Sequence, residues 1–199
     1  VRGISKTQKL ILISNPTVFP LYGPGVVASL ENAGFKVQVA LMPDGETYKN
    51  MAEAEKILDE MLVSGLERGS MVIALGGGVV GDLAGFVAAI YQRGIDFVQL
   101  PTTLLAQVDS SVGGKVAVNH PRGKNLVGAF HQPRLVLIDI NTLATLNDRE
   151  YRSGLAEVLK YGIIYDASFF NYLDQNAHQI MDRNPECLGT IIYHSCRIK

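Results

Sequence analysis

Hydrophobic positions in the first two thirds of the chain follow two alternating patterns. Short apolar runs typical of strands occupy residues 10–14, 35–41, 70–75, 97–100 and 135–139. Between these runs, apolar residues recur at helical spacing over residues 22–33, 49–64, 80–91 and 102–108. Strands that alternate with helices form a parallel sheet with helices on both faces. The pattern therefore predicts an α/β fold built on a parallel sheet.

The last third of the chain shows a different pattern, with helices and turns only. They are predicted over residues 142–146, 148–161, 168–177 and 185–199. We place a domain boundary near Thr145, so that residues 1–145 form the α/β domain and residues 146–199 begin an all-helical domain. About 50 helical residues seldom bury a core of their own, and the last helix still continues at Lys199. We therefore expect that the sequence is truncated.

Composition excludes several classes of protein. Of 199 residues, 47% are hydrophobic, which is enough for a buried core, and 18 basic against 19 acidic side chains leave a net charge of −1. This balance gives no field that would attract nucleic acid or an anionic membrane. Cys187 and Cys196 lack the spacing of a zinc knuckle or a secreted disulfide framework, and no signal-peptide core follows Lys9. We expect a cytoplasmic protein.

Residues 71–91 imitate a membrane span, because Asp82 is their single charge over a length that could cross a bilayer. A triple glycine divides this stretch, so we interpret it as a buried strand followed by a separate buried helix.

The glycine run itself is a candidate binding site. Gly76, Gly78 and Gly81 stand between a predicted strand and a predicted helix, in the spacing of the dinucleotide fingerprint. Such glycines bring backbone amides and a helix N-terminus close to a pyrophosphate. The run follows the third strand and lacks an acidic residue at the end of the next strand, so a tight strand-to-helix turn is the alternative. Asp82 favours a ligand, since a carboxylate in so apolar a stretch needs a partner.

Two further polar segments follow predicted strands. Residues 43–49 include Asp44 and Glu46, and the sequence by itself favours a turn and helix cap there. Residues 109–115 run from Asp109 to Lys115, and a capped helix end with a glycine turn competes equally with a phosphate or hydroxyl site. Residues 120–125 form a polar loop that could face solvent or a ligand.

On the helix that begins at Asp148, Glu157 and Lys160 are three residues apart and share a face. They are either an intrahelical ion pair or a metal ligand beside a base. His178 and His194 lack ligand spacing to Glu157, and a catalytic zinc needs about three protein ligands. Neither a Ser-His-Asp set nor a P-loop lysine is present in the sequence, so those classes of enzyme are excluded.

Several motifs in order resemble the 3-dehydroquinate synthase family of the shikimate pathway. They are LGGGVVGD at 75–82, QRG at 92–94, PTTLLAQVDSSVGGK at 101–115, GKN at 123–125 and GLAEVLKYG at 154–162. The resemblance implies an α/β domain that binds NAD, followed by a helical domain that carries most ligands of a Zn²⁺ or Co²⁺ ion. The active site of that family lies in the cleft between the two domains.

The resemblance also implies roles for individual residues. Cofactor contacts are implied for Asp44, Glu46, Lys49, Gly78, Val79, Val80, Gly81, Asp82, Thr102, Thr103, Lys115, Lys124, Thr142, Leu143 and Thr145. Substrate contacts are implied for Asp109, Lys115, Asn125 and Lys160, with Arg93 reaching a neighbouring subunit's substrate, and Lys115, Asn125 and Lys160 are the implied catalytic residues. Glu157 is the implied metal ligand, and the remaining ligands lie outside this chain.

The activity implied is conversion of 3-deoxy-D-arabino-heptulosonate 7-phosphate to 3-dehydroquinate and phosphate, with NAD regenerated in each turnover. We expect a homodimer in the full-length protein and an inactive fragment. Three alternatives stay open: another sugar-phosphate cyclase such as a 2-deoxy-scyllo-inosose synthase, a polyol dehydrogenase, and a nucleotide-binding fragment without turnover.

Overall fold

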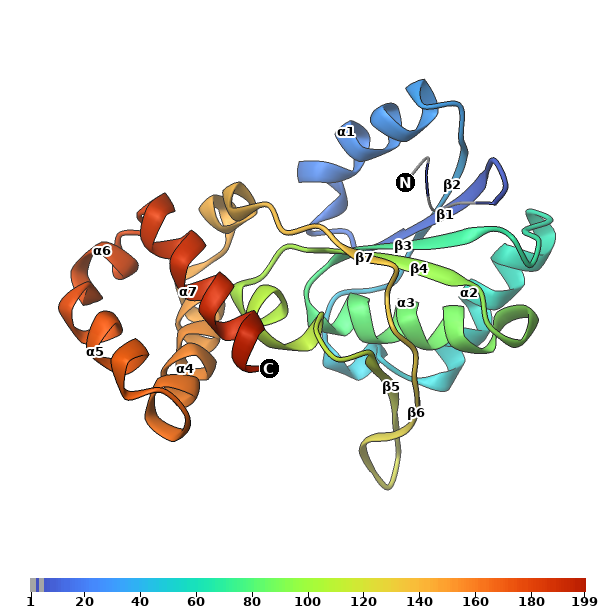
Figure 1. Ribbon diagram of the computed structural model, residues 1–199. Coiled ribbons are helices and arrows are strands. Elements are labelled where there is room, and N and C mark those ends of the chain that lie inside the picture. Colours follow the sequence, from blue (N-terminus) through green and yellow to red (C-terminus); the bar gives the residue numbers. More distant parts are fainter. Residues whose placement is uncertain (1–2, 4–5) are drawn as a thin grey trace.

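The computed structural model of the chain describes residue 3 and residues 6–199, and its centre is a parallel sheet of five strands (Figure 1). The strand order is β2-β1-β3-β4-β7. The strands are β1 (Lys9–Ser14), β2 (Lys36–Leu41), β3 (Met71–Gly76), β4 (Asp96–Pro101) and β7 (Leu135–Val136). Each pairs in parallel with its neighbour, which confirms the predicted fold class.

Helices cover both faces of this sheet. Helix α1 (Phe19–Asn32) lies on one face, and α2 (Met51–Val63) and α3 (Gly78–Ile90) lie on the other (Figure 1). The side chains of β1 alternate between the two: Leu10 and Leu12 pack in a cluster with α1, and Ile11 and Ile13 pack in a cluster with α2 and α3. Burial on both faces explains why the strands read as continuous apolar runs.

The segment that imitates a membrane span consists of strand β3 followed by helix α3. Eight of the 13 residues of α3 are buried against the sheet, as the sequence predicted. Across the described part of the chain, no helix has both the length and the apolar character that crossing a membrane requires.

The segment after β4 differs from the prediction. Residues 102–108 do not form one short helix, because a π-helical turn, η3 (Ala106–Ser110), follows Leu105. An antiparallel hairpin that the sequence did not predict then projects from the domain, formed by β5 (Lys115–His120) and β6 (Gly123–Phe130) (Figure 1). The predicted polar loop is therefore the tip and bulge of this hairpin, and the strand predicted at 135–139 ends at Val136.

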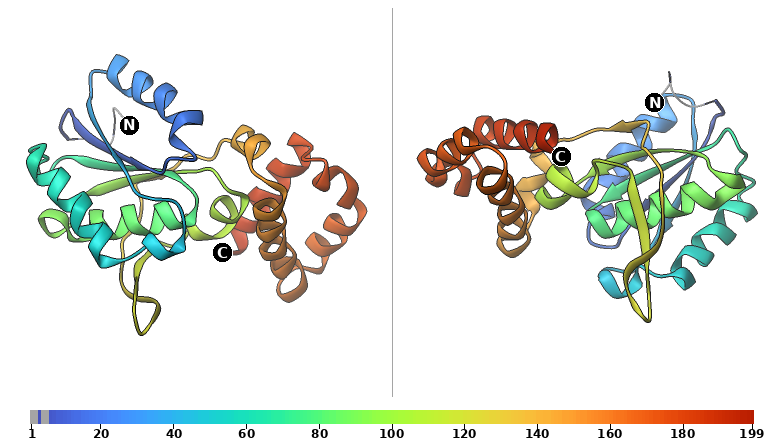
Figure 2. Two further views of the ribbon diagram at one scale, coloured as in Figure 1. Left: turned by 180° about the vertical axis from the view of Figure 1, so that it is seen from behind. Right: turned by 60° about the horizontal axis from the view of Figure 1, so that its bottom comes forward.

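The C-terminal part consists of helices, as predicted. They are η4 (Ile140–Thr145), α4 (Asp148–Ile164), α5 (Ala167–Gln175), α6 (Ala177–Met181) and α7 (Pro185–Ile198). Asn147, Asp166 and Asn184 cap the N-termini of α4, α5 and α7. These helices lie beyond the carboxyl ends of the sheet strands (Figure 2).

The helical part shares its core with the segment that follows β4. Leu104 and Val108 belong to the same buried cluster as Tyr151, Val158 and Ile191. This agrees with the expectation that so few helical residues do not bury a core alone.

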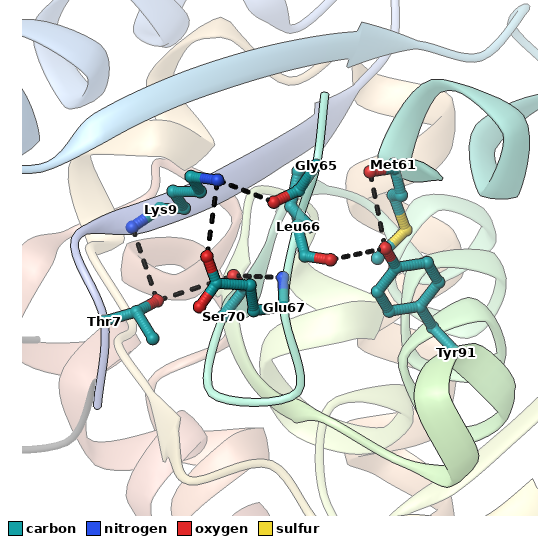
Figure 3. A network of polar contacts seen from close by, with 8 residues as sticks. All are labelled: Thr7, Lys9, Met61, Gly65, Leu66, Glu67, Ser70 and Tyr91. Carbon is teal, nitrogen blue, oxygen red and sulfur yellow. Dashed lines mark hydrogen bonds and ion pairs between the residues drawn. The ribbon is translucent and has the colours of Figure 1, made fainter. Parts of the chain in front are cut away.

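At the opposite edge of the sheet, polar contacts fix the loop between α2 and β3 (Figure 3). The Tyr91 hydroxyl donates to the carbonyl oxygen of Leu66 at 2.7 Å, and Ser70 Oγ accepts from the backbone nitrogen of Glu67 at 2.9 Å. Lys9 Nζ donates to the carbonyl oxygen of Gly65 at 2.8 Å. This network lies at the amino end of the strands and is structural.

Candidate active site

The glycine turn between β3 and α3 is tightly enclosed. Helix α3 begins at Gly78, and its N-cap residue, Gly77, provides no side-chain cap. A Cβ atom on Gly77 would lie 2.9 Å from Thr103 Cγ2, and one on Gly78 would lie 2.8 Å from Ser110 Oγ. The turn therefore needs glycine for close packing, and it presents the first backbone amides of a 13-residue helix at the carboxyl edge of the sheet.

A buried lysine joins two elements beside this turn. Lys49 is 4% exposed, and its Nζ lies 2.9 Å from Asp82 Oδ2 on α3 and 3.2 Å from Glu46 Oε1 on η1 (Glu46–Tyr48). Burial raises the pKa of Asp82, although the hydrogen bond and charge of Lys49 oppose that rise. Asp82 thus has the partner that its apolar surroundings require.

Glu46 sits in a different environment. Burial acts to raise the pKa of Glu46, but a hydrogen bond from Asn119 at 2.8 Å and the charges of Lys49 and Lys124 outweigh it and lower the pKa. Asp44 is exposed and accepts a hydrogen bond from Thr17 Oγ1 at 3.0 Å. The segment is a turn that leads to a helix, as the sequence favoured, and Asn50 caps α2.

Asp109 lies at the contact between the two parts of the chain. Its Oδ1 accepts hydrogen bonds from the Tyr161 hydroxyl at 2.9 Å and from Lys199 Nζ at 2.5 Å. Burial raises the pKa of the Tyr161 phenol well above its ordinary value, and the neighbouring Asp109 adds a further rise. Tyr161 therefore stays protonated and remains a donor to Asp109.

A cleft of about 450 Å³ brings four of the predicted residues together, namely Asp82, Asp109, Lys115 and Asn125. Ser110, Phe130 and Lys199 also line it, and the sequence did not single out Phe130 or Lys199 for a ligand. The hairpin supplies the wall opposite α3, which explains why a site could not be assembled from the sequence without predicting β5 and β6.

Other predicted cofactor residues lie on the other side of the glycine turn. Thr102 and Thr142 line a second cavity, of about 470 Å³, between α1 and the sheet. Thr102 is 4% exposed, and its Oγ1 has no hydrogen-bond partner among the described residues. Thr145 Oγ1 bonds to the Tyr22 hydroxyl, whereas the Leu143 side chain is buried in the helical core.

The predicted metal ligand and its neighbour form an ion pair. Lys160 Nζ contacts Glu157 Oε1 on α4, and this hydrogen bond raises the pKa of Lys160. The intrahelical ion pair that the sequence offered as the alternative to a metal ligand is therefore present. In the part of the chain that the structure describes, no three His, Cys, Asp or Glu side chains gather closely enough to hold a metal ion. His178 pairs with Asp182, and His194 stacks on Phe169, so each histidine contacts a partner other than Glu157.

Arg93 lies far from the cleft within its own chain. It is exposed in η2 (Tyr91–Arg93), after the C-terminus of α3 and before β4, at the amino edge of the sheet. Helix α3, about 20 Å long for 13 residues, separates it from the glycine turn. The structure thus places Arg93 away from the cleft of its own chain, and its contact with a neighbouring subunit's substrate stays a prediction.

Sequence and structure comparisons agree on the family. Residues 39–153 match the model of the 3-dehydroquinate synthase N-terminal domain, and residues 154–199 match that of the C-terminal domain. The chain is 59% identical over 99% of its length to 3-dehydroquinate synthase of Pelotomaculum thermopropionicum, and 53% identical over 98% to that of Vibrio atlanticus. It spans about half the length of these relatives, 53% and 54%.

Solved structures extend this comparison. A 2-epi-5-epi-valiolone synthase from Streptomyces hygroscopicus, solved with NAD⁺ and Zn²⁺ bound, superposes with a TM-score of 0.90 at 31% identity, over 96% of this chain and 54% of that one. An iron-containing alcohol dehydrogenase superposes with a TM-score of 0.78 over 96% of this chain and 60% of that one, at 14% identity, which shows a shared fold alone. On the matches to both domain models and the identity to the relatives, this chain belongs to the 3-dehydroquinate synthase family.

Proposed function

We propose that this chain supplies the cofactor-binding half, and one wall of the substrate cleft, of an enzyme that converts 3-deoxy-D-arabino-heptulosonate 7-phosphate to 3-dehydroquinate and phosphate. The observation that carries the proposal is the cleft beside the glycine turn, where Asp82, Asp109, Lys115 and Asn125 converge. Family membership supports the same reaction. Homologous cyclases are described with bound NAD⁺ and with Zn²⁺ or Co²⁺.

The residues around the turn fit NAD. No side chain caps the amides that begin α3, and the lack of a Cβ on Gly78 keeps this turn free of side-chain atoms next to Ser110. Ser110 Oγ and Thr102 Oγ1 are buried hydroxyls without a hydrogen-bond partner among the described residues, one on each side of the turn. A dinucleotide that crosses the turn would satisfy both amides and hydroxyls. When bound, NAD would supply reversible hydride transfer at a ring alcohol of the substrate.

Polar side chains of this chain would make the contacts with the substrate. Lys115 and Asn125, on the hairpin, would bind the substrate phosphate, since an ammonium and an amide suit phosphate oxygens. Asp109, held by Tyr161, would accept a hydrogen bond from a substrate hydroxyl. Lys160 stands on α4 within the electrostatic influence of Asp109, so it would approach the substrate from the helical side.

Metal binding is different, because the described residues do not form a metal site on their own. Glu157 remains our proposed ligand, to be completed by residues outside this sequence. Replacement Glu157→Gln should lower the metal content of the full-length protein, measured by elemental analysis, while NAD affinity stays within about two-fold.

We place the domain boundary near Thr145, and we propose a homodimer in which Arg93 reaches the partner's substrate, because Arg93 is exposed at the edge opposite its own cleft. Two free cysteines support a reducing compartment, the cytoplasm. Mixing an inactive Arg93→Ala variant with an inactive Lys115→Ala variant would restore part of the activity if each site uses both subunits.

The decisive test is phosphate release by the full-length protein with the heptulosonate phosphate and NAD. We expect phosphate and 3-dehydroquinate without stoichiometric NADH, since the cofactor is regenerated. Accumulating NADH would refute a cyclase and favour a polyol dehydrogenase. Turnover with a different sugar phosphate only would favour another cyclase, and NAD binding without any turnover would favour a non-catalytic protein.

A further inference from the structure

Asn119, on β5, was not among the predicted site residues, yet it contacts two of them. Its Nδ2 donates to Glu46 Oε1 at 2.8 Å and to the Glu46 carbonyl oxygen at 3.3 Å. Its Oδ1 accepts from the backbone nitrogen of Asn125 at 2.9 Å. Because one neighbour only accepts and the other only donates, the orientation of the Asn119 amide is determined by its surroundings.

The contact to Asn125 lies at an irregularity of the hairpin. The register passes from the pair Val118 and Val127 to the pair His120 and Gly123, so that Asn119 faces three residues of β6. One of these, Asn125, has a φ of 56°, in the left-handed region. The Asn119 side chain holds the amide of this strained residue, and with it the bulge that carries Lys124 and Asn125.

A backbone hydrogen bond joins β5 to the same segment that carries Glu46. The Asn119 nitrogen donates to the Lys49 carbonyl oxygen at 2.7 Å, so β5 is attached to the segment that leads into α2. The charged groups around Glu46 come from three elements: Lys49 at the end of η1, Asp82 on α3 and Lys124 on β6. Among them Asn119 is the neutral donor that orients the carboxylate.

We propose that Asn119 is a positioning residue that aligns the cofactor side of the site, through Glu46, with the substrate side, through Asn125. The inference rests on the proposed function, in which Glu46 contacts NAD and Asn125 contacts the substrate. It requires that one side chain controls both groups, and that its two hydrogen bonds can be removed separately.

Two substitutions separate the two hydrogen bonds. Asn119→Asp keeps an acceptor for the Asn125 amide but replaces the donor to Glu46 with a second carboxylate. Asn119→Ala removes both bonds. Asn171→Asp, at an exposed position on α5, adds the same charge elsewhere and is the matched control. The double variant Glu46→Gln/Asn119→Asp restores one hydrogen bond with donor and acceptor exchanged.

For Asn119→Asp we expect NAD affinity, measured by calorimetry, to fall about ten-fold at pH 7. The loss should shrink toward pH 5, because one of the two facing carboxylates then takes up a proton. In the wild type Glu46 should contribute no such change in this range, since its pKa is already lowered. The double variant should recover part of the affinity, although Glu46→Gln also alters the proposed contact of Glu46 with NAD. A merely structural role predicts the same loss at both pH values and no recovery, and either result would overturn the inference.

Two readouts do not depend on NAD. A carbon-13 NMR titration should show a higher Glu46 pKa in Asn119→Asp than in the wild type, and hydrogen exchange at the Asn125 amide should accelerate only in Asn119→Ala. Unchanged Glu46 titration or unchanged exchange would overturn the inference. A wild-type chain that binds no NAD would instead refute the proposed function, and these two readouts would still decide the role of Asn119.

Discussion

Lys49 offers the sharpest test of how the site is held together. The substitution Lys49→Met keeps most of the apolar stem and removes the ammonium that pairs with Asp82 at 2.9 Å and with Glu46 at 3.2 Å. Two carboxylates then face one another with no cation between them. Breaking a fully buried pair costs about 3–5 kcal/mol of unfolding free energy. The Asp82 side chain is 18% exposed toward the cleft, so we expect about 2–3 kcal/mol.

The loss should depend on pH in a defined direction. The pKa of Asp82 is raised above its unfolded value of 3.8, so the folded state binds more protons than the unfolded state between those two values. Stability therefore falls as pH rises through this window. Without Lys49 the pKa of Asp82 rises further and the window widens. The difference between variant and wild type should thus be largest at pH 7 and smaller near pH 4.5.

Urea unfolding followed by circular dichroism measures the effect. Lys56→Met is the matched control, because Lys56 pairs with Glu53 at 2.8 Å but its own side chain is 67% exposed, so its loss should destabilise the fold less than the loss of Lys49 does. The double variant Lys49→Met/Asp82→Leu should be more stable than Lys49→Met by about 1–2 kcal/mol. A loss below about 1 kcal/mol at pH 7, a loss equal at both pH values, or no gain in the double variant would refute the reasoning.

Three other substitutions test the packing and the glycine turn. Gly154→Ala places a Cβ 2.7 Å from the backbone nitrogen of Leu105, so unfolding free energy should fall by about 2 kcal/mol, and an unchanged melting temperature would contradict this contact. Tyr91→Phe removes the hydroxyl donor of the α2–β3 loop and should cost about 1 kcal/mol in urea unfolding, with NAD affinity unchanged because the loop lies at the opposite edge. Gly78→Ala brings a methyl group within 2.8 Å of Ser110 Oγ, one of the hydroxyls proposed to bind NAD, so NAD affinity should fall at least about ten-fold. The circular dichroism spectrum should stay the same. Unaltered NAD affinity would exclude this turn as the pyrophosphate site.

The sheet and its helices were predictable because burial is continuous. Strand β3 is buried at all six positions, and α3 at eight of 13, so apolar periodicity was a direct signal. The hairpin was not predicted because β6 is exposed or half-buried along its whole length. Val116 and Val118 of β5 belong to the core and alternate at strand spacing, which is the signal that could have revealed β5.

The site was predictable in its residue types and not in its connections. Asp109, Lys115 and Asn125 do line one cleft. Tyr161 reaches Asp109 across 52 residues of sequence, and Asn119 reaches Asn125 through an irregularity of the hairpin register. Neither residue carries a local pattern that distinguishes it from an ordinary strand or helix residue. Ser110 lies in the predicted polar segment 109–115, and only the structure shows that its Oγ is buried without a partner among the described residues.

The cleft is bounded by segments that lack regular backbone hydrogen bonding, and polar side chains compensate. Gln107 is fully buried in the π-helical turn, and its Nε2 donates to the carbonyl oxygens of Pro101 and Asp139 and to Thr142 Oγ1, at 3.1 to 3.2 Å. Asn119 performs the equivalent task for the hairpin bulge. Removing such a residue leaves buried polar groups unpaired and also releases a ligand-facing segment. Stability and ligand binding at this edge of the sheet are therefore expected to change together, whereas substitutions in the α2–β3 loop that Tyr91 holds should change stability alone.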